Sequence, residues 1–396
     1  MSDDSIVIVA ARRTAIGGFG GHFKEAGLPQ LGAAVMTACI ADTGLPGDAI
    51  SEVLMGCVLP AGVGQAPARQ AMLAAGLPVE VGATTLNKVC GSGMKAVMTA
   101  HDLIRAGSAQ VVLAGGMESM SGAPYILPKA RFGLRMGHAQ LLDHMFFDGL
   151  QNPYDGNMMG HFAEETVAHY GFTREQQDDF ARRSVERAIH AVESGAFVTE
   201  IAPVTVTGRR SEVTVSEDEE PFNCALDKIA TLRPAFRRDG TVTAASSSSI
   251  SDGAAALLIM SAAEASRRGL TPLARIAGHA SHAQAPEWFT TAPAGAIRKL
   301  LEQTGWAAAD VDLYEINEAF ACVTMAAMED LSLAAERVNV NGGACALGHP
   351  IGATGARLIV TLIHALRARG LSRGVAALCI GGGEATAIAV EIPAGA

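Results

Sequence analysis

The sequence predicts an α/β fold in which helices and sheets stack in an α/β/α/β/α order. Continuously apolar runs at 6–10, 111–114 and 375–380 alternate with helical patterns. Such runs are typical of strands that helices cover on both faces of a sheet. The same order of elements also occurs twice along the chain, and two such halves fused face to face would give five layers.

The two copies can be followed element by element. Each opens with an amphipathic helix and a strand, at 31–56 and 294–316. A glycine-rich turn, a second helix and a buried strand follow, at 87–119 and 341–385. This diverged duplication predicts two similar layered halves related by a pseudo-twofold axis.

Composition changes between the two copies. A polar helix at 172–195, a strand-like run at 201–208 and the acidic run at 216–220 indicate an inserted domain. The predicted domains are a first half at 1–118 together with 250–268, an inserted loop domain at 119–249, and a second half at 269–396.

Composition also excludes several classes of protein. The chain has 396 residues, of which 49% are hydrophobic and 18% charged, with a formal net charge of −10. No apolar run reaches the roughly 20 residues that cross a bilayer, and the acidic opening does not have the layout of a secretory signal. The negative charge argues against nucleic acid as a partner. We expect an enzyme of the cytoplasm with no membrane segment.

The cysteines predict neither disulfides nor a metal site. There are seven, an odd number, and none lie in a CxxC pair or at zinc-finger spacing. One basic stretch, 119–142, carries Lys129, Arg131, Arg135 and His138 without a carboxylate. It could face the phosphates of a ligand, or be an exposed loop that bridges subunits.

Two glycine-rich turns carry reactive side chains. Cys90 precedes Gly91 and a predicted helix, so its thiol can be exposed at a sharp turn where the helix dipole favours the thiolate. His349, in LGHPIGATG, occupies the corresponding turn of the second copy and could accept the proton of Cys90. The alternatives are a buried core cysteine and a structural histidine.

Two further residues lie near these turns in the predicted fold. Cys379 ends an apolar strand before Gly381, where backbone N–H groups could form an oxyanion hole. A nucleotide-phosphate loop is the rival interpretation, but neither phosphate-loop motif is present. Asn317 could hold a water molecule or a carbonyl oxygen, or could cap a helix that begins at Glu318.

Together these motifs resemble those of the thiolase family, which includes acetyl-CoA acetyltransferases and 3-ketoacyl-CoA thiolases. The elements CGSG, GGMESMS, NEAF, GHPIGATG and CIGGG occur in the family's order, and the resemblance covers nearly the whole chain. It implies a thiolase-like duplicated five-layer fold with an inserted loop domain. It also implies a role in fatty acid metabolism and no metal or organic cofactor, since coenzyme A thioesters are the substrates.

The resemblance assigns roles to the residues singled out above. Cys90 would carry the acyl group, His349 would activate it, and Cys379 would remove or return the α-proton. One oxyanion site would use His349 and a water on Asn317, and the other the backbone N–H groups of Cys90 and Gly381. Charge develops on two carbonyl oxygens when a carbon–carbon bond forms, which explains the need for two sites.

The substrate contacts are less well defined by the resemblance. Ser246 and the region after the acidic run differ from common family residues, which leaves Lys228 or the basic stretch for the CoA phosphates. Glu384 replaces an uncharged residue. The expected substrate-binding residues are Ser248, Ala244, Phe236, Lys228, Met158, Met159, Ala319 and Phe320.

We therefore predict an acyl-CoA C-acyltransferase that acts on acyl-CoA and CoA as a homodimer or homotetramer. It would perform reversible Claisen condensation or thiolysis of 3-ketoacyl-CoA through an acyl-cysteine. The alternatives are a decarboxylating ketoacyl synthase and a catalytically silent acyl-CoA or lipid-binding protein. The ketoacyl synthase would have a second histidine at the position of Cys379.

Overall fold

The computed structural model describes residues 4–208 and 211–393, so the outermost ends of the predicted domains, 1–3 and 394–396, lie outside the described residues. The strands are β1 (Ile6–Arg13), β2 (Gly17–Gly18), β3 (Glu52–Gly56), β4 (Gly82–Leu86), β5 (Val111–Ser119), β6 (Tyr125–Ile126), β7 (Leu142–Asp143), β8 (Val204–Thr207), β9 (Glu212–Val215), β10 (Ser251–Ser261), β11 (Ala274–Ala283), β12 (Leu313–Ile316), β13 (Arg373–Ile380) and β14 (Glu384–Glu391). The α-helices are α1 (Leu28–Thr43), α2 (Pro67–Ala74), α3 (Ser92–Arg105), α4 (Met159–Tyr170), α5 (Arg174–Glu193), α6 (Ala262–Arg267), α7 (Ala292–Thr304), α8 (Ala321–Leu331), α9 (Ala344–Leu347) and α10 (Ile351–Ala368).

The strands form two half-sheets that share the same internal order, apart from β4, which is an additional edge strand of the first. In the first the order is β4-β3-β5-β10-β1, and in the second it is β12-β13-β14-β11. Each half has a parallel pair, β3 with β5 and β12 with β13, followed by antiparallel neighbours. A short antiparallel pairing of Val7 and Ile8 with Arg275 and Ala274 joins β1 to β11. The predicted duplication is confirmed by this repeated order.

Alternate residues of each strand face different layers, because successive side chains of a β-strand point to opposite faces of the sheet. On β1, Ile6 and Ile8 belong to a central apolar cluster, whereas Val7 belongs to an outer cluster. On β14, Ile388 faces the central cluster and Ala387 a second outer one. Both half-sheets are therefore covered on both faces.

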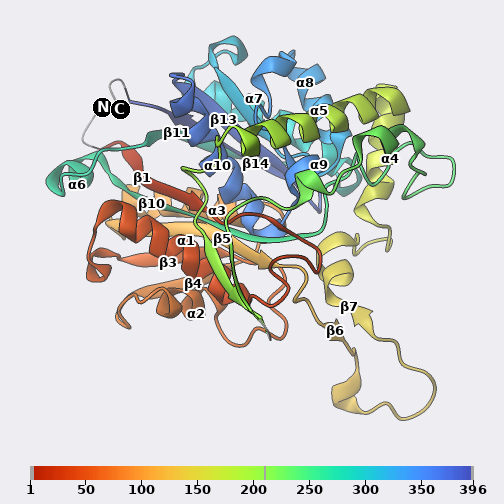
Figure 1. Cartoon of the computed structure of the whole chain (residues 1–396), viewed down its shortest axis with the longest axis horizontal. Coiled ribbons are helices and arrows are strands. Elements are labelled where there is room, and N and C mark those ends of the chain that lie inside the picture. Colours follow the sequence, from red (N-terminus) through yellow and green to blue (C-terminus); the bar gives the residue numbers. More distant parts are fainter. Residues whose placement is uncertain (1–3, 209–210, 394–396) are drawn as a thin grey trace.

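The helices complete five layers, which run from bottom to top in Figure 1. Helices α1 and α2 cover the first half-sheet, α3 and α10 lie between the half-sheets, and α7 with α8 covers the second. Among the described residues, one helix is long and apolar enough to cross a membrane, namely α10, and 83% of this helix is buried inside the protein. Helix α10 is the central helix of the core, and the predicted α/β/α/β/α order is confirmed.

The two central helices approach each other closely at their N-terminal ends. A methyl group on Gly355 of α10 would lie 2.5 Å from the backbone nitrogen of Met94 on α3. A methyl group on Gly93 of α3 would lie 2.9 Å from the backbone nitrogen of Ala356. Because only glycine permits this distance, these two residues set the separation of the turns that carry Cys90 and His349.

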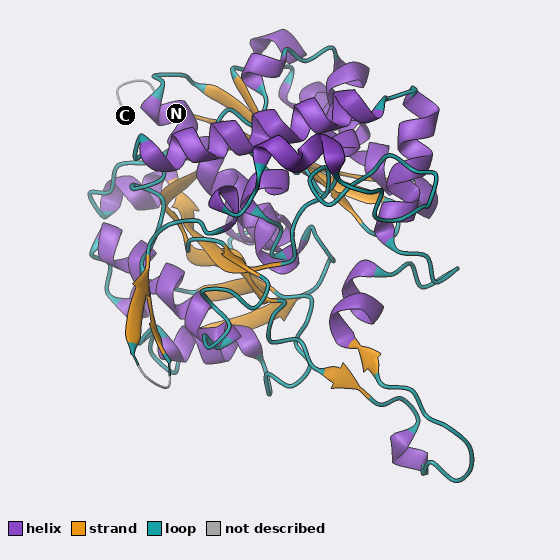
Figure 2. Cartoon of the chain, turned by 45° about the vertical axis from the view of Figure 1, so that its right-hand side comes forward, coloured by secondary structure: helices purple, strands orange, loops and turns teal. Residues whose placement is uncertain are grey.

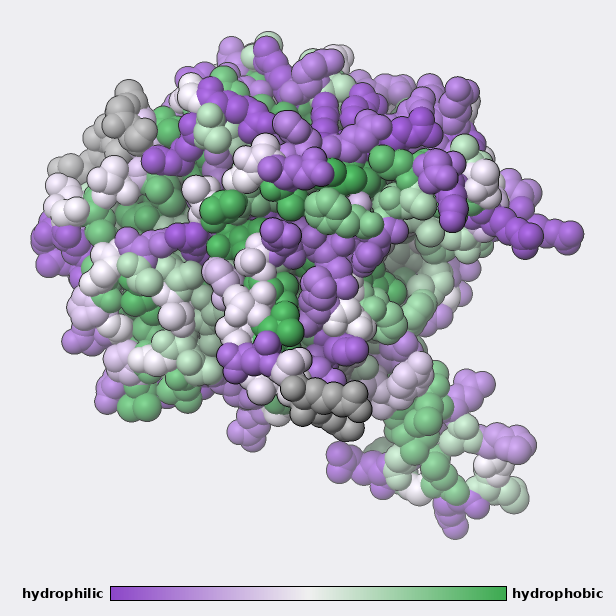
Figure 3. Space-filling view, viewed as in Figure 1, coloured by the Kyte–Doolittle hydropathy of each residue, from purple (hydrophilic) through white to green (hydrophobic). Residues whose placement is uncertain are grey.

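The region between the halves contains an arm that projects from the body (Figures 1 and 2). The arm starts and ends at the two-stranded pair of β6 and β7, and its tip exposes Phe132 and Met136 with exposed fractions of 86% and 98%. Figure 3 shows apolar surface along this arm. Helices α4 and α5 follow it, and the chain then returns to the first half-sheet as β10.

We predict that Gly355→Ala destabilises the protein by about 3 kcal/mol and lowers turnover, because the added methyl group separates α10 from the backbone of α3. The measurement is chemical unfolding, together with kcat. The control is Gly27→Ala, where a methyl group meets its nearest neighbour at 3.8 Å; it is expected to cost about 1 kcal/mol or less. Equal effects of the two substitutions would contradict the close helix approach.

Candidate active site

Cys90 lies on a tight turn between β4 and α3. Ser92 fixes this turn, because its Oγ accepts a hydrogen bond from Lys88 N at 2.8 Å and donates one to Val89 O at 2.6 Å. Val89 has a φ of 48°, which is strained for a β-branched residue. The turn leaves Cys90 partly exposed.

The electrostatics of Cys90 differ from the sequence-based expectation of a thiolate. Although Cys90 is partly exposed, loss of solvation around its thiol raises the pKa to about 11, while the backbone N–H groups of Gly381 and of Cys90 itself act in the opposite direction and lower it. The loss of solvation therefore raises the pKa of Cys90 by more than the dipole at the N-terminus of α3 lowers it, and the resting sulfur is a thiol at neutral pH. The two N–H groups come from the two predicted oxyanion-hole residues.

His349 is held in one tautomer by its neighbours. Thr354 donates its hydroxyl proton to Pro350 O at 2.9 Å, so its oxygen is free to accept a proton from His349 Nδ1, 2.6 Å away. Nε2 is then left with a lone pair. Burial, with a smaller contribution from Arg357, lowers the pKa of His349 to about 3, so the resting imidazole is neutral.

Asn317 lies beside this imidazole, directly after β12. Its Nδ2 is 3.5 Å from His349 Nε2. Its buried Oδ1 has no hydrogen-bond partner among the described residues, which suits an oxygen that holds water or a ligand. The alternative of a helix cap at Asn317 is wrong, because the helix α8 begins at Ala321 with Phe320 as its N-cap.

Cys379 is the residue before the last of β13 and is 1% exposed. Burial, and then the nearby Cys90, raise its pKa well above the ordinary value of a thiol. The two cysteine turns touch, since a methyl group on Gly91 would overlap the side chain of Ile380. The two thiols therefore lie close together where the two halves of the fold join.

A mostly apolar cavity of about 640 Å³, including its open mouth, leads to these groups. His349 is part of its wall. Cys90 packs against the apolar cluster that contains the lining residues Met120 and Ile351, and Cys379 packs in the cluster that contains Phe320. The cavity is lined by Met120, Phe146, Leu150, Met158, Met159, Gly160, Phe236, Ser247, Ser248, Ser249, Ile250, Ala319, Phe320, His349 and Ile351.

Most of the expected substrate-binding residues lie on this wall, but two do not. Ala244 and Lys228 are exposed and lie outside the lining. The six on the wall are Ser248, Phe236, Met158, Met159, Ala319 and Phe320. Sequence reasoning missed Met120 and Thr354, although both belong to motifs that it singled out, GGMESMS and GHPIGATG.

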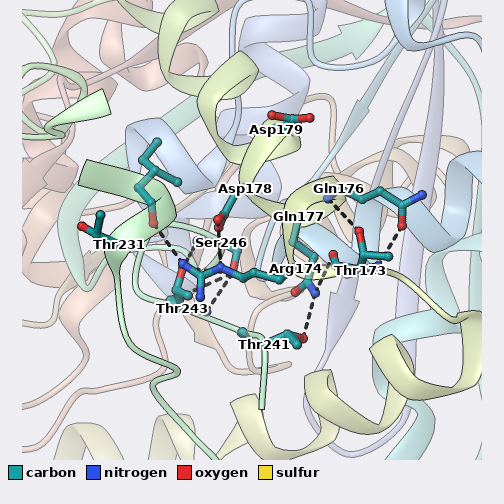
Figure 4. A network of polar contacts seen from close by, with 12 residues as sticks. Thr173, Arg174, Gln176, Gln177, Asp178, Asp179, Thr231, Thr241, Thr243 and Ser246 are labelled. Atoms are coloured by element: carbon teal, nitrogen blue, oxygen red, sulfur yellow. Dashed lines mark hydrogen bonds and ion pairs between the residues drawn. The ribbon is translucent and has the colours of Figure 1, made fainter. Parts of the chain in front are cut away.

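Residues 241–249, which include four consecutive serines and are called the serine loop here, are held by side chains of α5 (Figure 4). Gln177 Nε2 donates to Thr241 Oγ1 at 2.9 Å. Arg174, which pairs with Asp178 of the same helix at 2.8 Å, donates to Ile229 O at 3.0 Å in the segment that precedes the loop. Ser246 is fully buried and accepts a hydrogen bond from Thr243 N at 2.9 Å. Ser246, where the sequence departs from the family pattern, therefore bonds inside the loop and does not line the cavity, whereas Ser247–Ser249 do.

Two carboxylates stabilise the turns that carry the reactive side chains, but neither is part of the cavity lining. Glu118 is buried and accepts hydrogen bonds from the backbone N–H groups of Val58, Leu59 and Gly352, although burial still raises its pKa to about 7. Glu384 pairs with Lys88 at 2.6 Å and lies outside the cavity lining. This unusual glutamate thus connects the Cys379 turn to the Cys90 turn.

Comparisons with known proteins follow the same division into halves. The family model of the N-terminal thiolase domain matches residues 6–263, and that of the C-terminal thiolase domain matches 270–392. An acetyl-CoA acetyltransferase of Chromobacterium violaceum is 50% identical over 98% of this chain and 100% of its own length. A probable acetyl-CoA acyltransferase of Staphylococcus aureus is 46% identical over 98% of both chains. The crystal structure of the Bacillus anthracis acetyl-CoA acetyltransferase matches with a TM-score of 0.96 and 43% identity, over 98% of this chain and 99% of that one.

The raised pKa gives a testable pH dependence. We expect the rate at which iodoacetamide alkylates Cys90 to rise about tenfold per pH unit from pH 7 to 9, without a plateau below pH 10, because the reactive thiolate stays a minor form. Mass spectrometry of the Cys90 peptide gives the rate. Urea-unfolded protein is the control; its alkylation rate should reach half of its maximum near pH 8.5 and level off above about pH 9.5. A plateau in the folded protein near pH 7 would mean a preformed thiolate.

Proposed function

The chain belongs to the thiolase family, and we propose that the cavity at the junction of its two halves is where it transfers acyl groups between CoA thioesters. The protein is an acyl-CoA C-acyltransferase, which condenses two acyl-CoA molecules or cleaves a 3-ketoacyl-CoA with CoA. One observation carries the assignment of the residues. The backbone N–H groups of Cys90 and Gly381 both favour the charged form of the Cys90 sulfur, which lies near a second thiol and packs against the cavity wall that contains the imidazole of His349.

In the first half-reaction Cys90 takes the acyl group. The sulfur attacks the thioester carbon as its proton passes to Nε2 of His349, which carries a lone pair because the proton of the ring is on Nδ1 and is donated to Thr354. The N–H groups of Cys90 and Gly381 stabilise the oxyanion, and the departing CoA thiolate takes a proton from Cys379. The products are acyl-Cys90, free CoA, a Cys379 thiolate and a protonated His349.

In the second half-reaction a carbon–carbon bond forms. The Cys379 thiolate removes the α-proton of a second acyl-CoA, whose enolate oxygen is stabilised by His349 and by a water on Asn317. The carbanion attacks acyl-Cys90, the carbon–sulfur bond breaks, and the sulfur regains its proton from His349. The cycle starts and ends with two thiols and a neutral imidazole, the forms that burial favours.

The walls of the cavity support a thioester with an apolar arm. Methionine and aromatic side chains can follow the pantetheine chain, and the rings of Phe236 and Phe320 meet edge to face with centroids 5.7 Å apart. We keep Lys228, exposed on the 3₁₀ segment Leu226–Thr231, as the proposed contact of a CoA phosphate. Because the relatives named above include acetyl-CoA acetyltransferases, acetyl-CoA is the proposed substrate.

We further propose that the arm around residues 125–143 joins dimers into a homotetramer. Its exposed Phe132 and Met136 would lose solvent contact against another copy, which is the usual fate of such apolar surface. The basic residues Lys129, Arg131 and Arg135 lie on the same arm and are exposed. This favours the interpretation of the basic stretch 119–142 as a loop that bridges subunits over its interpretation as a phosphate contact.

Incubation with acetyl-CoA tests the roles of the two cysteines. We expect the wild-type chain to gain one acetyl group by intact-mass measurement and Cys90→Ala to gain none. Cys379→Ala should still acquire the adduct while thiolysis of acetoacetyl-CoA falls by at least about 100-fold, because proton transfer at carbon is lost. Loss of the adduct in both variants would contradict the division of labour.

Light scattering tests the arm. We expect the double substitution Phe132→Ser and Met136→Ser to reduce the assembly from tetramer to dimer while acetylation of Cys90 continues, because the arm is remote from the sulfur. The matched control is Val198→Ser, which alters a side chain that is 73% exposed on the body. An unchanged mass in the double variant would overturn the proposed contact.

A further inference from the structure

Three side chains that commonly bind metal ions converge outside the cavity. His101 and Asp102 lie in the last turns of α3, and His279 lies on β11. Nδ1 of His101, a carboxylate oxygen of Asp102 and a ring nitrogen of His279 all lie within 4.8 Å of one another. Sequence spacing gave no sign of this group, because His279 follows His101 by 178 residues.

The spacing of the donor atoms fits one bound ion. Asp102 Oδ1 is 3.0 Å from His101 Nδ1 and 3.0 Å from His279 Nε2, and the two nitrogens are 3.2 Å apart. In a tetrahedral zinc site with bonds of about 2.0 Å, neighbouring ligand atoms are about 3.3 Å apart. The three atoms thus form nearly one face of such a tetrahedron.

Hydrogen bonds alone leave one of these three contacts unfavourable. If both imidazoles donate to Asp102 Oδ1, their two N–H groups oppose each other at 3.2 Å. If one imidazole instead presents a lone pair, that lone pair faces the carboxylate oxygen or the other lone pair. A cation in the centre, with all three atoms as acceptors, makes every contact favourable.

The chemistry and exposure of the group favour a borderline transition metal. Two imidazole nitrogens and one carboxylate oxygen suit Zn²⁺, whereas Ca²⁺ and Mg²⁺ prefer oxygen ligands. The side chains of His101 and His279 are 15% and 16% exposed, and that of Asp102 is 57% exposed. An ion can therefore enter from solvent, and water can complete its coordination.

We propose that His101, Asp102 and His279 form a zinc-binding site that fastens α3 to β11. Helix α3 belongs to the first half of the fold and carries Cys90 before its N-terminus, while β11 belongs to the second half. The site lies about 14 Å along the helix axis from the start of α3, at 1.5 Å per residue. The ion would therefore stabilise the junction of the halves without touching the reacting atoms.

Titration of the metal-free full-length chain with ZnCl₂ tests the proposal by calorimetry. We expect one ion per chain, and an affinity at least about 10-fold lower in His279→Gln and in Asp102→Asn. The matched control His190→Gln removes an exposed histidine of α5 and should bind normally. Cys90→Ala should also bind normally, which separates this site from zinc on the catalytic thiol.

Thermal unfolding supplies a second readout that does not depend on acyl transfer. Zn²⁺ should raise the Tm of the wild-type chain and of His190→Gln but not that of His279→Gln. If His279→Gln already has a lower Tm than the wild type without zinc, Asp102→Asn is the variant to compare, because Asp102 is exposed; zinc should not raise its Tm either. Unchanged zinc affinity in both ligand variants, or binding that disappears in Cys90→Ala, would overturn the proposal.

Discussion

The active site depends on the close approach of α3 and α10 in the central layer. Each helix belongs to a different copy of the duplicated unit, and each begins just after a turn that carries a reactive side chain. The absence of a side chain at Gly93 and Gly355 lets the backbones meet, so the Cys90 and His349 turns share one end of the layer. The contact of Gly91 with Ile380 adds the Cys379 turn. Catalytic geometry is here a direct consequence of backbone packing.

Burial then determines the chemistry of these groups. Loss of solvation disfavours every charged form, which raises the pKa of both thiols and lowers that of the imidazole. A resting ion pair of thiolate and imidazolium is therefore absent, and charge appears only as substrate arrives. The donors that stabilise this charge are already in place as backbone N–H groups, which need no reorganisation.

Much of this could be predicted from the sequence, because it is encoded locally. Apolar strands and the repeated order of elements gave the five layers, and the glycine-rich turns identified Cys90, His349 and Cys379. The thiolate expectation failed because a helix terminus can be read from sequence whereas the degree of burial cannot. The alternative of a cap at Asn317 failed because α8 starts at Ala321, three residues after the predicted start at Glu318. The positions of Ala244 and Lys228 outside the cavity, like the convergence of His101 with His279, follow from tertiary packing that no local pattern contains.

We propose that the N–H groups of Cys90 and Gly381 converge on the carbonyl oxygen of the acyl group that the Cys90 sulfur carries. Infrared difference spectroscopy of the enzyme acetylated with carbonyl-¹³C acetyl-CoA measures this directly. Two hydrogen bonds to the carbonyl oxygen should shift the thioester stretch of acetyl-Cys90 to lower frequency than in a free thioester in water. A stretch at or above the frequency of the free thioester would mean that the two turns do not form a common oxyanion hole.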